Sequence, residues 1–186
     1  MPSPLVHLAA GSLIAHETVR RTRAPFPRAW KIWGVCLFFS MAPDLDSVAG
    51  FLANDMGKYH NQFTHSLFFA VLFCLALAWP VRKLIPAWSW KTAFLVPLLC
   101  YALHSLLDWA TRGRGVLLFW PFFRERLLSP VILFYGVRWS DGLLSWRHGI
   151  TLGSEILTLA VGFGLYRLWR RRRANGAANG IDSEKE

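Results

Sequence analysis

Long hydrophobic runs, separated by short polar or basic segments, dominate this chain. A first apolar stretch covers Leu5 to Ala15, and the longer runs are Ile32 to Pro43, Ser66 to Val81, Thr92 to Leu107 and Ile150 to Leu168. A full membrane span needs roughly 17 to 25 residues, so we expect these runs to form tilted or partly embedded helices. Strand signals are weak. The pattern predicts an all-α, polytopic helical membrane protein with about four to six membrane-embedded helices.

Composition supports one compact membrane domain. The chain has 186 residues, 54% of them hydrophobic, and its 10 tryptophans lie at or near the ends of the apolar runs. Indole rings settle where a bilayer meets water. The final residues are small or polar and show no periodicity. We therefore expect a membrane-embedded domain over residues 1 to 173 and a disordered polar C-terminal tail over residues 174 to 186.

The net charge of +10 is distributed as in a membrane protein and does not indicate a nucleic-acid partner. Basic residues gather in Arg20 to Lys31, in Arg82 to Lys91 and in Arg170 to Arg173, which are the segments expected to face the cytoplasm. Strict alternation then puts Asp44 to His65 and Asp108 to His148 on the opposite face. The sequence predicts a multi-pass protein with a cytoplasmic C-terminus.

Seven histidines and aspartates border the apolar runs, where ionisable groups should be scarce. They are His7, Asp44, Asp46, His60, His65, His104 and Asp108. A buried ionised carboxylate is costly unless a cation or hydrogen bonds compensate it. All seven fall on the same predicted outer face, so they are candidate ligands of one metal site there.

Two pairs illustrate the local geometry expected. His104 and Asp108 are four residues apart and share one face of a helix, although a histidine packed against an aspartate is the alternative. Asp44 and Asp46 follow Pro43, which favours an extended segment with both carboxylates on one side. A solvated turn is the alternative for that pair.

The remaining histidines depend more on context. His60 and His65 are five apart, which on one helix separates them by about 140°. We expect Thr64 to be a helix N-cap, with His60 in the loop, His65 in the first turn, and the Thr64 and Ser66 hydroxyls supporting the ligands. The alternative for His60 and His65 is that they are two interfacial histidines without a ligand role. His7 is a candidate ligand only because it lies on the same predicted membrane face as the others.

The order of these motifs resembles a known family. It runs through His7 in Leu5 to Gly11, Pro43-Asp44-Leu45-Asp46, His60-x-x-x-Thr64-His65-Ser66, His104-x-x-x-Asp108, Gly115 to Pro121, and Glu155. The chain resembles the YdjM-like, LexA-regulated, membrane-bound metal-dependent hydrolases. That resemblance implies a bacterial inner-membrane helical protein whose metal ligands are the histidines and aspartates above. Asn61 and Gln62 replace an Arg-Gly pair of the family pattern, which would alter substrate binding or activity if that arginine grips an anionic group.

The ligand types suggest hydrolytic chemistry. Seven candidates exceed the needs of one tetrahedral ion, so two divalent ions are expected, and mixed imidazole and carboxylate ligation favours Zn or Mn. Metal-activated water would attack an ester or phosphoester. Asp46 is a candidate catalytic carboxylate. Glu155, inside an apolar run, is a further ligand, a general base or a hydrogen-bonded helix carboxyl.

Basic residues suggest the substrate. Arg112 and Arg114 precede the apolar segment Gly115 to Phe123, which could lie along the interface. They are candidate binders of an anionic lipid headgroup, so a membrane lipid or another phosphoester is the expected substrate, although arginines also snorkel to bulk lipid phosphates. Two other classes of protein compete with a hydrolase. One is a transporter with a helix broken at Pro97, and the other is a non-catalytic protein with a sealed structural metal site.

Overall fold

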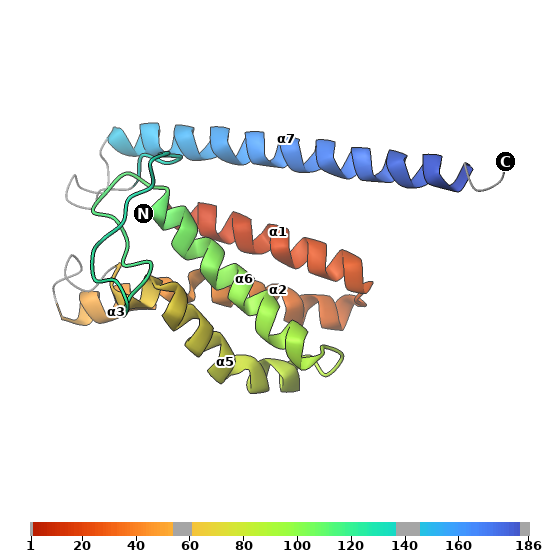
Figure 1. The fold of residues 1–186 in the computed structure, drawn as a ribbon, viewed down its shortest axis with the longest axis horizontal. Coiled ribbons are helices and arrows are strands. Elements are labelled where there is room, and N and C mark those ends of the chain that lie inside the picture. The colour runs from red at the N-terminus through yellow and green to blue at the C-terminus, as the bar shows by residue number, and fades with distance from the viewer. Residues whose placement is uncertain (1, 54–60, 137–145, 183–186) are drawn as a thin grey trace.

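The computed structural model describes residues 2–53, 61–136 and 146–182, and the regular secondary structure in these ranges is helical (Figure 1). The elements are α1 (Pro4–Thr22), α2 (Phe26–Met41), the 3₁₀ turn η1 (Ala42–Asp44), α3 (Leu45–Leu52), the 3₁₀ turn η2 (Phe63–His65), α5 (Leu67–Leu84), α6 (Trp90–Trp109) and α7 (Arg147–Asp182). Within those ranges, β pairing is limited to the isolated bridges Thr111–Phe134 and Val116–Leu127. The prediction of an all-α fold is confirmed.

Local sequence explains where the helices begin. Pro4 starts α1, where the missing N–H costs nothing. Ser66 and Ser89 cap α5 and α6, and each hydroxyl accepts a hydrogen bond from a backbone N–H three residues later. Pro97 lies inside α6 without ending it, so the broken helix that the competing transporter class would use does not occur at Pro97. Neighbouring helices and local adjustments let apolar helices tolerate such prolines.

Two helical hairpins form a bundle. Helix α1 packs on α2, α5 packs on α6, and α6 lies against both α1 and α2 (Figure 1). Gly11 permits the α1–α2 contact, because a Cβ there would overlap Ser40 Oγ and lie 3.2 Å from the Cys36 carbonyl oxygen. The hairpins place the start of α1 and the ends of α2 and α6 at one end of the bundle, and this is the end that carries the candidate ligands.

Three of the described helices are long and apolar enough to cross a membrane. They are α5, α6 and the stretch His148–Arg172 of α7. Their outer faces carry exposed leucines, such as Leu75 and Leu99, that a bilayer would cover. Only 11% of the apolar stretch of α7 is buried, since this helix runs along the side of the bundle near α1 (Figure 1). The fold is that of a helical membrane protein.

The C-terminal helix is longer than expected. The composition predicts a disordered tail from residue 174, whereas α7 continues to Asp182. The segment after the arginines contains alanines and no proline, and alanine has the highest helix propensity. The glycines at 176 and 180 weaken a helix, each by about 1 kcal/mol, without forbidding it.

Candidate metal centre

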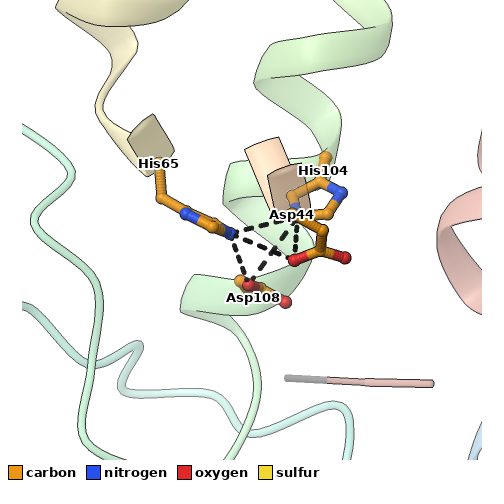
Figure 2. A group of neighbouring side chains, drawn as sticks. All are labelled: Asp44, His65, His104 and Asp108. Carbon is orange, nitrogen blue, oxygen red and sulfur yellow. Dashed lines mark hydrogen bonds and ion pairs between the residues drawn. The ribbon is translucent and has the colours of Figure 1, made fainter. Parts of the chain in front are cut away.

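Four of the predicted ligands meet at one end of the bundle. Asp44 ends η1, His65 ends η2, and His104 and Asp108 lie in the last turns of α6. Each offers one ligand atom, and these four atoms all lie within 4.8 Å of one another (Figure 2). His65, His104 and Asp108 are at least 97% buried, and Asp44 is the most exposed of the set. The sequence identified these four residues as candidate ligands, and the fold places them next to one another.

Five of the six ligand-atom separations are close to those around a tetrahedral divalent ion. His65 Nε2 lies 3.3 Å from His104 Nε2, 3.2 Å from Asp108 Oδ2 and 3.5 Å from Asp44 Oδ1. His104 Nε2 lies 3.5 Å from Asp44 Oδ1 and 3.8 Å from Asp108 Oδ2. Tetrahedral bonds of about 2.0 to 2.2 Å place ligand atoms roughly 3.3 to 3.6 Å apart. Two imidazoles and two carboxylates are also a donor set that suits Zn or Mn.

An oxygen acceptor next to each Nδ1 atom orients both imidazole rings. His104 Nδ1 donates to the carbonyl oxygen of Ser40 at 2.7 Å. His65 Nδ1 faces Asp46 Oδ2 at 3.3 Å, and Asp46 also accepts from the Thr64 hydroxyl at 2.7 Å. When both rings are neutral, as metal ligands are, protons held on the Nδ1 atoms leave both Nε2 lone pairs directed at the centre. Two lone pairs facing each other cannot form a hydrogen bond, whereas a shared cation satisfies both.

The carboxylates require positive charge at this place. Burial disfavours the ionised form of Asp44, but the imidazoles of His65 and His104, whose Nε2 atoms each lie 3.5 Å from Asp44 Oδ1, outweigh it and hold the pKa of Asp44 below its usual value. Burial likewise opposes protonation of His65, yet Asp108, Asp44 and Asp46 raise the pKa of His65 well above its usual value. The centre therefore attracts a proton, and it would attract a divalent cation by the same electrostatics.

His7 borders the centre on the α1 side. Its side chain is fully buried, its ring stacks on His104 with centroids 3.7 Å apart, and its Nε2 lies 3.4 Å from Asp108 Oδ1. Neither ring nitrogen of His7 forms a hydrogen bond among the described residues. Asp108 thus directs Oδ2 to the centre and Oδ1 to His7.

Glu155 connects α7 to the start of α1. It is 2% exposed, its Oε1 accepts from the Ser3 N–H at 2.6 Å, and its Oε2 accepts from the Ser3 hydroxyl. Of the three roles considered for Glu155, these contacts correspond to a hydrogen-bonded helix carboxyl. The contact also places a negative charge at the N-terminus of α1, which is the positive end of the helix dipole. Glu155 is not one of the four clustered residues.

Other candidates lie around the centre. Arg112 and Arg114 are exposed, and the Arg112 guanidinium lies over the Tyr135 ring at 5.8 Å. Asn61 adopts a left-handed conformation with φ 60°, and its carbonyl accepts from Arg126 at 3.2 Å. His60 falls outside the described residues.

Two local predictions at the centre are wrong. The segment after Pro43 is not extended, because Pro43 fits the first turn of η1, and Asp46 follows in the first turn of α3. The two carboxylates therefore approach opposite nitrogens of His65. The N-cap of α5 is Ser66, not Thr64.

Three supporting groups were not found by sequence reasoning. They are the Ser40 carbonyl, Ser3, and Tyr101, whose hydroxyl donates to the Thr64 carbonyl at 2.7 Å. Tyr101 lies one turn before Ser105 and His104 on α6, and this spacing along the helix was the available signal. For the Ser40 carbonyl and for Ser3, the sequence contains no comparable signal.

Comparison with known proteins identifies the family of this chain. A family model described as YdjM inner membrane protein matches residues 1–177. The chain belongs to the YdjM inner membrane protein family. The inner membrane protein YbcI of Escherichia coli (strain K12) is 34% identical over 148 residues, which cover 74% of this chain and 82% of YbcI. No solved structure matches the chain. The family resemblance is confirmed, and with three helices able to span a bilayer, this YdjM-family chain is an inner membrane protein.

Proposed function

We propose that this YdjM-family protein is a membrane-bound metal-dependent hydrolase acting on an ester or phosphoester. The observation that carries the proposal is the set of ligand-atom separations between 3.2 and 3.8 Å around His65 and His104. A bound Zn or Mn ion would lower the pKa of a coordinated water and polarise the substrate oxygen. Burial of the ligands strengthens that electrostatic effect.

The protein's own groups hold and orient the site. His65 and His104 supply Nε2 atoms, and Asp44 and Asp108 supply carboxylate oxygens that balance the cation's charge. Asp46 keeps the His65 ring in position, so we assign it a positioning role. Water and substrate would enter beside Asp44, whose side chain is 10% exposed while the other three are fully covered.

A second ion would use His7. Its Nε2 and the Oδ1 of Asp108 face each other at 3.4 Å, beside the four-residue centre. Asp108 would then bridge the two ions, as carboxylates do in two-metal hydrolytic sites. Glu155 would hold the start of α1, and hence His7, through Ser3.

The substrate would be an anionic ester, in a lipid or free in solution. Arg112 and Arg114 are exposed just after the end of α6, close in sequence to Asp108. A guanidinium group binds phosphate oxygens in a bidentate manner. From the distribution of basic residues, we place the site at the outer face of the inner membrane and the C-terminus in the cytoplasm.

A non-catalytic metal site is the second candidate. Four protein ligands already complete a tetrahedral shell, and structural zinc sites are closed in this way. Transport is less well supported, because α6 is unbroken and the ligands lie at helix ends. Cobalt substitution separates the two main candidates, since a coordinated water gives the weaker visible absorption of five-coordinate Co²⁺ and a closed shell gives the intense tetrahedral spectrum.

The first experiment is elemental analysis of the detergent-purified protein. We expect stoichiometric Zn or Mn in the wild type, loss of metal in a His104→Ala, Asp108→Ala variant, and retention in the control His16→Ala, which removes an exposed histidine. If the double variant does not fold, Asp44→Asn replaces it. Metal-dependent hydrolysis in an ester and phosphoester screen would support the enzyme. Stoichiometric metal without hydrolysis would favour the structural role, and no metal after reloading would exclude both.

A further inference from the structure

A pocket lies at the other end of the bundle from the candidate metal centre. It has a volume of about 310 Å³ and is lined by residues of the α1–α2 turn with the start of α2 and of the α5–α6 turn. Both turns lie at the right of the bundle in Figure 1. The pocket's lining residues are Pro25, Pro27, Arg28, Lys31, Leu84, Ile85, Pro86 and Ala87. The candidate metal centre lies at the opposite helix ends, so this pocket belongs to a different site.

The pocket combines positive charge with an apolar lining. Among the described residues that line the pocket, Arg28 and Lys31 are the charged ones and none is a carboxylate. The two cations lie three apart on the first turns of α2. Neither cation forms an ion pair with a described residue. The other lining side chains are apolar. Such a pocket suits a ligand with one anionic group attached to an apolar body.

The surroundings place the pocket at headgroup depth. It lies where the membrane-spanning helix α5 ends and just before α6 begins. Trp30 and Trp90 nearby are 64% and 58% exposed, and Lys83 Nζ lies 4.1 Å above the Trp79 ring. Exposed indoles and lysines of this kind mark the interfacial layer of a bilayer.

We propose that this pocket binds the headgroup of an anionic phospholipid. Arg28 and Lys31 would bind the lipid phosphate, and the prolines with Leu84 and Ile85 would contact the glycerol and the first methylenes. Basic pockets between membrane helices bind anionic headgroups by this combination of charge and contact. The site is independent of the proposed hydrolase activity.

The test measures phosphatidylglycerol binding to the full-length detergent-purified protein by native mass spectrometry. Arg28→Gln with Lys31→Gln should weaken binding roughly 10- to 30-fold, because each Lys or Arg near an anionic lipid contributes about fivefold. The matched control, Arg171→Gln with Arg172→Gln, removes two exposed cations of α7 that do not line the pocket, and it should weaken binding much less than the pocket variant does. Unchanged thermal stability of the variants shows that they fold.

Three outcomes would overturn the proposal. Equal phosphatidylglycerol binding by both double variants would mean that the two cations do not form the site. Equal binding of phosphatidylcholine and phosphatidylglycerol to the wild type would mean that the pocket does not select anionic headgroups. Displacement of the lipid by an equal concentration of inorganic phosphate would identify a site for free phosphate.

Discussion

His65 and His104 direct their Nε2 atoms at each other across 3.3 Å, while an oxygen acceptor faces each Nδ1. The two residues come from η2 and α6 and are 39 positions apart. A histidine pair that only filled space would not need both rings fixed from behind. This relationship is the reason to treat the buried cluster as a metal centre.

Asp46 should tune the centre without supplying a ligand. Asp46→Asn keeps the size of the side chain but weakens acceptance of the His65 Nδ1 proton, so metal affinity should fall roughly 10- to 100-fold while stoichiometry at saturating metal is unchanged. Titration of the metal-free protein with Zn²⁺ measures this. Complete loss of metal at saturation would instead make Asp46 a ligand. Thr64→Val, which removes only the hydroxyl bonded to Asp46, should have a smaller effect in the same direction.

His7 reports on the second ion. If Asp108 bridges two ions, His7→Ala should lower the metal content from two ions to one per chain, because the variant keeps all four residues of the main centre. Elemental analysis after reloading with Zn or Mn measures the ratio. One ion per wild-type chain would refute the two-ion proposal, and the single-ion centre would stand.

Gly11 should be intolerant of a side chain. In Gly11→Ala the new Cβ meets Ser40 Oγ and the α2 backbone, so α1 and α2 must separate, at a cost on the order of 1 to 3 kcal/mol. Metal affinity should fall as well, since the Ser40 carbonyl accepts from His104. Thermal unfolding in detergent measures the change. Gly34→Ala is the matched control: apart from its chain neighbours and the backbone of α2 itself, no described atom lies within 4 Å of its Cβ position, and the variant should be neutral or more stable by up to about 1 kcal/mol.

Glu155→Gln separates a positioning role from a catalytic one. The amide can accept only one of the two Ser3 hydrogen bonds, so the melting temperature should fall, corresponding to a loss of about 1 to 3 kcal/mol. A Ser3→Ala variant should lose part of the same stability, and the double variant should be less than additive because the two groups share one contact. Metal content should stay at the wild-type level. Unchanged stability together with abolished hydrolysis would make Glu155 the general base instead.

The sequence by itself determined the helical membrane class and most of the ligand types. Apolar runs near the length of a bilayer leave little alternative to helices, because backbone groups in lipid must be satisfied within the segment. The i,i+4 spacing placed His104 and Asp108 on one face of α6, as the structure confirms. Histidines and aspartates at the ends of apolar runs were visible because charge is costly there.

Only the tertiary structure decided how these groups are used. The distinction between Asp44, which faces the centre, and Asp46, which faces the back of the His65 ring, arises from the 3₁₀ turn at Pro43 and the approach of η2. The partner of Glu155 is Ser3, 152 positions away, and the acceptor for His104 is a carbonyl 64 positions away. Hydrophobic periodicity fixes which face of a helix is buried, but it does not fix which distant backbone or side-chain group meets that face, because that depends on how the hairpins pack against one another.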